Sequence, residues 1–365
     1  MRASRIVTRR LAALIGAVGL TTGLMAAAAG VAQASVPDKW GFAFVNDPSA
    51  ASTPILNHQA GSWTAGHVTS HPGAVGQVFV VFPHLASKNG VVHVTAVNPN
   101  AVWCQAQKWG PVGVNEVVAV RCYLPGGKPT FSQFDVLYTT STKGAFSGGA
   151  YGYVHFQPGP SVVATFNSVG AVNTVTAGPV GEWVVTLPGL GSTTFAGNVQ
   201  VTAADPGGAA KCEIGGWAFN SGAQRFLVRC YNGGTTPLKT GWSLSYQRDR
   251  SIFGGVPKEF AYTFNNKPTV TGPYAPVPPA VNFNSLHGVN TITQSGGRSL
   301  VRFPRVGTLP STVLASPVKI GPGFCNLESP FAIGGGIVLV RNVVCFTAAG
   351  APKPFASTVT YTAAH

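Results

Sequence analysis

The 365-residue sequence is short of charge, and of acidic residues above all. Charged residues make up 9% of the chain, and only 10 residues are Asp or Glu. A disordered chain would have more charge and less than the 45% hydrophobic content found here. A coiled coil or helical repeat would have far fewer than 46 Gly and 28 Pro. The composition therefore indicates a globular chain of short strands and many turns.

Motifs that carry enzyme chemistry are also missing. The sequence has no Gly-x-Ser-x-Gly elbow, no phosphate loop, no dinucleotide-binding glycine pattern and no His-Glu-x-x-His. Paired-carboxylate chemistry needs two acidic residues in one cleft, and no spacing of the few carboxylates indicates such a pair. We therefore favour a non-enzymatic function without a cofactor.

Residues 1–34 have the features of a secretory signal peptide. Basic residues precede a long uncharged stretch that ends in a small-x-small cleavage pattern: Arg2, Arg5, Arg9, Arg10, then 11–32, and Ala32-Gln33-Ala34. We expect cleavage after Ala34 and a secreted product, extracellular or wall-associated, without a transmembrane anchor. The export route, general or twin-arginine, stays open. The segment holds 4 of the 24 basic residues and no acidic ones, so the rest of the chain carries +10.

The remaining sequence contains one unit three times, at 36–147, 148–256 and 257–365. Each unit has two cysteines, spaced 18, 18 and 20 residues apart. A proline follows the second cysteine by 7 residues and a tyrosine follows it by 16. Before the first cysteine comes Gly-x-x-x-Val-x-(Phe/Leu)-Pro, and each unit opens with aromatic-small-aromatic, as in Trp40-Gly41-Phe42. The third unit has an additional Pro-rich insert at 273–279.

Within each unit the hydrophobic period is two, which is typical of strands. In the second unit Trp183, Val185 and Leu187 alternate with the residues between them. We count about seven strands per unit, separated by Gly, Pro and Asn turns. The pattern predicts an all-β protein of three tandem small antiparallel β-sandwich or barrel domains, and leaves the choice between sandwich and barrel open.

An even number of cysteines in an exported protein indicates disulfides. Because the three units are equivalent, the pairs are expected within units: Cys104–Cys122, Cys212–Cys230 and Cys325–Cys345. Turn residues lie midway between each pair, so each disulfide should link the two strands of a hairpin. There is no Cys-x-x-Cys, and two thiolates per unit cannot complete a tetrahedral metal site.

An aromatic residue recurs on each hairpin, as Trp109, Trp217 and Phe331. These side chains are candidates for a platform that binds sugar or wall polymer. The alternative is that each aromatic fills one end of a core, and its recurrence in all three units favours packing.

Basic residues are concentrated in the third unit, which carries +6. Arg298 and Arg302 alternate with Val301 and Phe303, so we expect them on the solvent face, and Arg305 follows. Such a face could bind an anionic wall polymer or an acidic glycan, and the alternative is a merely solvated face. Nucleic acid is a poor candidate, because the basic residues are dispersed and the compartment is wrong.

Histidines are concentrated in the first unit. His58, His67 and His71 could form a metal site, which would make the protein a hydrolase or another metal-dependent enzyme. The alternative is polar loop residues, since Pro72-Gly73 would end a strand at once. A metal site is not our prediction, because no carboxylate completes the set.

The repeat resembles secreted actinobacterial proteins with tandem disulfide-containing β-repeats of about this length, a family with no assigned activity. The shared motifs are an Asn-Ser start (Asn167-Ser168, Asn284-Ser285), the Gly-x-x-x-Val-x-Phe-Pro segment, a Val-Thr-Ala strand (94–96, 201–203) and the hairpin. The first unit has Asn57-His58 in place of Asn-Ser, and the third has Ser316-Pro317-Val318-Lys319 in place of Val-Thr-Ala. The resemblance implies fold and location only. We predict a cell-surface or wall interaction module, with a structural matrix component as a further alternative.

Overall fold

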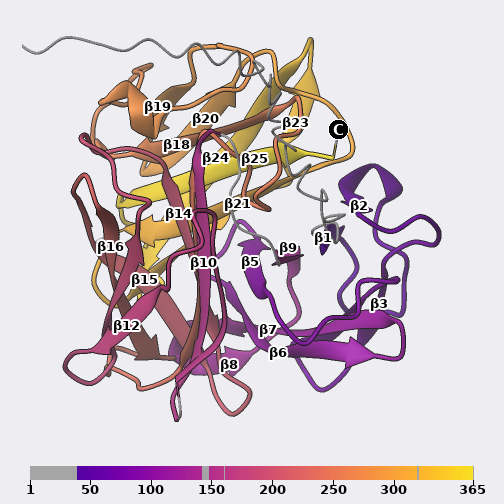
Figure 1. Cartoon of the computed structure of the whole chain (residues 1–365). Helices are drawn as coiled ribbons and strands as arrows, with labels where there is room; N and C mark the ends of the chain where they lie inside the picture. Colours follow the sequence, from indigo (N-terminus) through magenta and orange to yellow (C-terminus); the bar gives the residue numbers. More distant parts are fainter. Residues whose placement is uncertain (1–38, 142–147, 160, 319, 365) are drawn as a thin grey trace, which may run out of the picture. The chain divides into compact units, whose positions relative to one another are not determined.

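The computed structural model describes residues 39–141, 148–159, 161–318 and 320–364 (Figure 1). The predicted signal peptide, 1–34, lies outside the described residues. Residues 36–365 form one compact unit. As the sequence predicts, the described chain is all-β, with three 3-10 turns at Leu56–His58, Pro125–Gly127 and Pro279–Val281.

The strands follow the three repeats in order. The first repeat has β1 (Lys39–Val45), β2 (Gln59–Gly61), β3 (Thr69–Pro72), β4 (Gln77–Phe82), β5 (Val91–Val97), β6 (Trp103–Val112), β7 (Asn115–Leu124), β8 (Lys128–Pro129) and β9 (Gln133–Thr140). The second has β10 (Ala150–Gln157), β11 (Ser161–Asn167), β12 (Thr174–Ala177), β13 (Glu182–Pro188), β14 (Asn198–Ala204), β15 (Ala210–Phe219), β16 (Ala223–Asn232) and β17 (Gly241–Arg248). The third has β18 (Phe260–Asn265), β19 (Thr291–Ser295), β20 (Arg298–Phe303), β21 (Ser311–Val318), β22 (Gly323–Leu327), β23 (Ala332–Gly334), β24 (Ile337–Thr347) and β25 (Ala356–Ala363).

Each repeat packs two half-sheets face to face as a sandwich. One, which we call the hairpin half-sheet, holds the cysteine hairpin, in the order β3-β4-β7-β6 in the first repeat. The other, the central half-sheet, has the order β5-β9-β1-β2. Val80 and Phe82 from the first half-sheet share an apolar core with Val94, Val136 and other residues of the second. The second and third repeats have corresponding cores.

The three repeats also share sheets, which the repeat pattern does not predict. The hairpin half-sheet of each repeat continues into the central half-sheet of another through one parallel strand pair. The pairs are β6 with β14 (Ala106 beside Ala204), β15 with β21 (Ile214 beside Val318) and β22 with β5 (Leu327 beside Val97). The first repeat thus joins the second, the second joins the third, and the third returns to the first.

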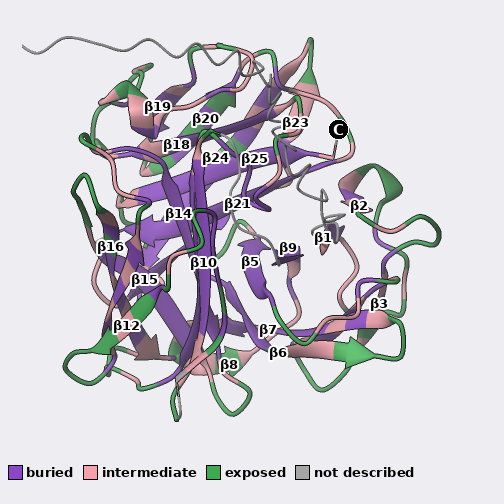
Figure 2. Ribbon diagram, viewed as in Figure 1, coloured by how far each residue is buried: buried purple, intermediate pink, exposed green. Residues whose placement is uncertain are grey.

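The central strands β5, β14 and β21 are buried on both faces, and β14 and β21 are coloured as buried along most of their length (Figure 2). On each strand one face contributes to the core of its own repeat, and the other face, which holds the polar residues together with Val91, Val97, Leu314 and Val318, points toward the other repeats. Three hydroxyls in this polar layer accept backbone N–H groups in a cycle: Val94 N to Thr202 Oγ1 at 3.1 Å, Val201 N to Ser316 Oγ at 3.0 Å, and Ala315 N to Thr95 Oγ1 at 3.0 Å. The three repeats therefore meet around an approximate three-fold axis.

All three predicted disulfides are present. Cys104–Cys122, Cys212–Cys230 and Cys325–Cys345 each join directly opposite residues of a hairpin, with Cα atoms 4.0, 4.1 and 4.0 Å apart. Each closes a loop of about 20 residues, which should stabilise its repeat by about 3 kcal/mol.

The Asn-Ser motif ties the opening strand of a repeat to its neighbours. Ser168 and Ser285 accept hydrogen bonds from the backbone N–H groups of Tyr151 and Phe260. In the first repeat the same bond runs from Trp40 N to Ser62 Oγ at 3.0 Å. The assignment of Asn57-His58 to this position was therefore wrong. Gly61-Ser62 occupies it, because the loop between β1 and β2 is longer than the loop between β10 and β11 in the second repeat.

Candidate functional site

The predicted arginines lie on the outer face of the third hairpin half-sheet. Along β20, exposed and buried residues alternate strictly. Arg298, Leu300 and Arg302 face solvent, while Ser299, Val301 and Phe303 face the core. The predicted placement of Arg298 and Arg302 on the solvent face is confirmed.

The neighbouring strand β24 extends this face. Arg302 lies directly opposite Leu339, and Arg341 follows two residues further along β24 on the same side. The result is an apolar strip with arginines on its rim, formed by Leu300, Ile337, Leu339, Arg298, Arg302 and Arg341; we call it the arginine-rimmed face. A groove of about 370 Å³ runs along part of this face, where Leu300, Arg302, Ile337 and Leu339 line it together with Thr291 and Thr293.

Among the described residues, one acidic side chain forms an ion pair with the arginines of this face. Arg298 Nε lies 2.6 Å from Glu328 Oε1, and Asn342 also donates to that carboxylate. Although partial burial acts to raise it, these hydrogen bonds and the arginine charge hold the pKa of Glu328 below its usual value. Within the described chain, Arg302 and Arg341 form no ion pair. Both guanidinium groups can therefore bind an external anion.

Arg305 lies apart from Arg298 and Arg302. It follows β20 with a positive φ of 71°, and its Nη1 is 3.5 Å from the carbonyl oxygen of Leu286. This contact holds its guanidinium at a loop, so Arg305 is an exposed charge near the arginine-rimmed face rather than part of it.

The hairpin aromatics lie where repeats meet. Trp109 is 4.1 Å, centroid to centroid, from His155 of β10, and Trp217 is 5.9 Å from Phe264 of β18. His155 and Phe264 occupy equivalent positions in the opening strands of the next repeats. Phe331 is 6% exposed and lies 5.1 Å from His58 of the first repeat.

This geometry agrees with the packing alternative for all three aromatics. Trp109 and Trp217 nonetheless stay partly exposed and border shallow grooves of about 330 and 350 Å³. Those grooves lie on the first and second hairpin half-sheets, where the third carries the arginine-rimmed face.

The histidines of the first repeat do not converge. His58 packs between the rings of Phe44 and Phe331, whereas His67 and His71 are exposed. Among the described residues, no group of three or more His, Cys, Asp or Glu side chains could hold a metal ion. The geometry gives no support to a metal centre built from His58, His67 and His71.

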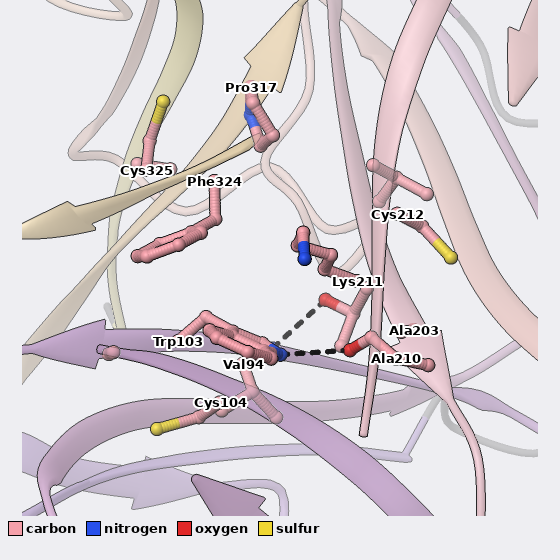
Figure 3. Close-up of a pocket in the computed structure, with 14 residues that line it drawn as sticks. Val94, Trp103, Cys104, Ala203, Ala210, Lys211, Cys212, Pro317, Phe324 and Cys325 are labelled. Atoms are coloured by element: carbon pink, nitrogen blue, oxygen red, sulfur yellow. Dashed lines mark hydrogen bonds between the residues drawn. The ribbon is translucent and has the colours of Figure 1, made fainter. Parts of the chain in front are cut away.

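A cavity of about 30 Å³ lies between the three hairpins and is lined by the first cysteine of each, Cys104, Cys212 and Cys325 (Figure 3). The residues just before those cysteines are Trp103, Lys211 and Phe324, and all three line it. Trp103 Nε1 donates to Ala210 O at 2.9 Å. Lys211 Nζ lies 4.8 Å from the centroid of the Trp103 ring and donates to two backbone carbonyls, Asn232 O and Gly234 O.

Lys211, which lines this cavity, is a residue that the sequence analysis does not single out. Its side chain is 3% exposed, and burial lowers the pKa of the ammonium to about 8. Aligning the repeats at the first cysteine would have revealed it, since only the second repeat has a charge where the others have an aromatic. With both carbonyls and the ring in place, Lys211 is a satisfied internal cation and not a free nucleophile.

The residue that follows the first cysteine of each hairpin lies at a contact between two repeats. Gln105 donates to Asp205 O and Gly208 O, and Asn326 donates to Asn100 O and Val102 O. The equivalent in the second repeat is Glu213, whose pKa burial raises to about 8 against the opposing charge of Arg229. This acid belongs to the contact between repeats.

Comparison with family models, with curated proteins and with solved structures finds no match for the chain. The resemblance to secreted actinobacterial repeat proteins therefore stays a prediction. Among the described residues, no helix is long and apolar enough to cross a membrane. Three disulfides fit an oxidising, extracellular environment.

Proposed function

We propose that the protein is an exported, non-enzymatic binding module that holds an anionic wall polymer or acidic glycan on its arginine-rimmed face. The observation that carries the proposal is a contiguous apolar strip, Leu300 with Leu339, bordered by Arg302 and Arg341. An exposed apolar strip with a charged rim is typical of an interaction site. The arginines give the sign of the ligand, because their planar forks suit phosphate and carboxylate groups.

The other two grooves support the assignment by contrast. Each of the three grooves is lined by one charged residue, Lys108, Arg225 or Arg302, but the third repeat also has the exposed Arg341 two residues beyond Leu339 on β24. A polymer of phosphate or carboxylate units should therefore prefer the third repeat, where two unpaired guanidinium groups flank one strip. Its sugar or glycerol carbons would lie along Leu300 and Leu339.

Binding to defined polymers tests the proposal. We expect the purified chain from residue 35 onward to bind poly(glycerol phosphate) or polygalacturonate, but not neutral dextran, with affinity that falls as salt rises. Replacing both arginines (Arg302→Ala with Arg341→Ala) should weaken binding about tenfold or more, since each charged contact contributes about 1 kcal/mol.

The matched control removes the same charge from the two equivalent grooves. Lys108→Ala with Arg225→Ala should leave affinity within about twofold of the unaltered protein. Equal losses of affinity in both double variants would show that binding depends on net charge and not on the arginine-rimmed face. Failure to bind either polyanion would overturn the proposal.

A further inference from the structure

Each of the three sheets ends, on its hairpin side, in a short strand: β3, β12 or β19. Each of these edge strands pairs with the next strand of its sheet, and the pairing identifies an equivalent central residue in each edge strand. Ser70 lies opposite Val80, Val175 lies opposite Val185, and Ile292 lies opposite Val301. In antiparallel pairs successive residues point their N–H and C=O groups alternately toward and away from the neighbouring strand. The backbone groups of these three central residues point outward.

Two of these edges are covered by the chain itself. Ser70 exchanges two backbone hydrogen bonds with Ser52, at 2.8 and 2.9 Å. Ile292 does the same with Tyr274, at 2.9 Å each. In each case the covering residue comes from the long loop after the opening strand of that repeat. Ser70 and Ile292 are both 0% exposed as a result.

The edge at β12 is open. In the second repeat β10 ends at Gln157 and β11 begins at Ser161, so no long loop is available to return over the edge. Within the described chain the backbone N–H and C=O of Val175 have no hydrogen-bond partner. Val175 is partly exposed, and the other residues of β12 are exposed, as the colouring near β12 shows (Figure 2).

The usual protections of an edge strand are absent from β12. Natural edges carry charges, prolines or covering loops to prevent pairing with other chains. β3 has Pro72 at an outward position, where β12 has Ala177. Residues 169–181 contain no charged side chain, and Val172 and Val180 are 78% and 68% exposed.

We propose that β12 pairs antiparallel with β12 of a second copy of this chain, about a two-fold axis at Val175. A single residue that exchanges two reciprocal hydrogen bonds, as Ser70 does with Ser52, can do so with its own symmetry mate. The sequence Thr174-Val175-Thr176 is symmetric about that point, so the pairing places Thr opposite Thr on both sides of the axis.

Charge favours this partner at this edge. Two copies of a strongly basic chain repel each other, so self-pairing requires a neutral contact, which residues 169–181 provide. On the strand inward of β13, Arg229 of β16 is paired with Glu182 at 2.9 Å, and Arg225 lies further along. Pairing at β12 would join the two sheets into one continuous sheet.

Sedimentation velocity over a concentration series tests the proposal on the purified chain from residue 35. We expect a monomer–dimer equilibrium, with slowed hydrogen exchange at the Val175 amide in the dimer. Val175→Pro removes the outward N–H and leaves the bonds of Thr174 and Thr176 to β13 intact. It should raise the dimer Kd by about tenfold or more.

Val175→Ala is the matched control, because it loses packing against the core but keeps the N–H; it should dimerise nearly as well as the unaltered chain. Thr176→Lys gives a second variant, in which each lysine lies opposite Thr174 of the other copy and the two like charges are diagonal neighbours on the same face; their repulsion should also weaken the dimer. A chain that is monomeric at all concentrations would overturn the proposal. So would a Val175→Pro dimer as tight as that of Val175→Ala.

Discussion

The cores inside the repeats and the cycle of hydroxyls between the repeats are both buried, yet they contain different side chains. Apolar clusters, such as that of Phe42, Ile252 and Leu314, also lie between repeats, but among the described residues the hydroxyl cycle has no counterpart inside the cores. Inside the second repeat, Trp183, Phe226 and Leu244 belong to one cluster of buried apolar side chains. Between repeats, Thr95, Thr202 and Ser316 form a cycle of hydrogen bonds with backbone N–H groups. His93 adds a bond to Ser245 at 2.8 Å.

This difference indicates a division of roles. Apolar burial is non-directional and supplies most of the favourable free energy of folding. Hydrogen bonds in a dry layer contribute less net stability, but each is lost if its partner shifts. We infer that the cores stabilise each sandwich and that the polar layer fixes how the three sandwiches are oriented.

The strongest test of this comparison removes an aromatic ring from a core. Phe226 is 1% exposed in the second repeat, and Phe226→Ala should lower the free energy of unfolding by about 4 kcal/mol. The midpoint of urea unfolding, at an unchanged slope, measures the loss. If Phe226→Ala lowers the free energy of unfolding by less than Thr202→Val does, the comparison is wrong.

A buried acid in the polar layer gives the next effect. Asp135 is bonded to Thr312 Oγ1 at 3.2 Å, and burial raises the pKa of its carboxyl to about 8 from an ordinary value of 3.8. The folded state therefore holds this proton more tightly than the unfolded chain. Its contribution to stability is fully present below about pH 4 and is lost as pH rises toward 8, at no more than about 1.4 kcal/mol per pH unit.

Comparison with Asp135→Asn isolates this effect. Glu116 and Glu213 have pKa values raised in the same direction, and His93 has one lowered to about 3, so the unaltered protein reports their sum. The difference in unfolding free energy between the two proteins should grow in favour of the Asn variant from pH 5 to pH 8. Parallel stability curves would show that Asp135 stays ionised in the fold.

The smallest effect should come from a single hydroxyl of the layer. Thr202→Val keeps the shape of the side chain but leaves Val94 N–H without its acceptor, which should cost about 1–2 kcal/mol. Ser316→Ala should cost a similar amount through Val201. If either variant costs as much as Phe226→Ala, the layer stabilises the fold as strongly as the cores do, and the division of roles is wrong.

Strands, hairpins and disulfides could be predicted because each depends on local pattern. Period-two alternation located β13 and β20, and equivalence between repeats fixed Cys212–Cys230. Solvent placement of Arg298 and Arg302 followed from the same alternation.

The shared sheets could not be predicted from the sequence. A strand whose polar side chains face another repeat has the same alternating pattern as a strand whose polar side chains face water. Asn198, Gln200 and Thr202 alternate with valines in the way a half-exposed strand does, yet β14 is buried on both faces. Lys211 was missed for a related reason. A charge beside a cysteine indicates exposure unless the aromatic ring and carbonyls that enclose it are known.

The parallel pair between Leu327 and Val97 has a consequence for how the chain is assembled. Two of the three joints connect repeats that are adjacent in sequence, but this one brings together segments more than 200 residues apart. The outer edge of β5 stays unpaired until β22 has been synthesised. Pairing between such distant segments is slow, because the entropy cost of closing a long loop comes before the favourable contacts form. During that interval the outer edge of β5 is exposed to pairing with other chains.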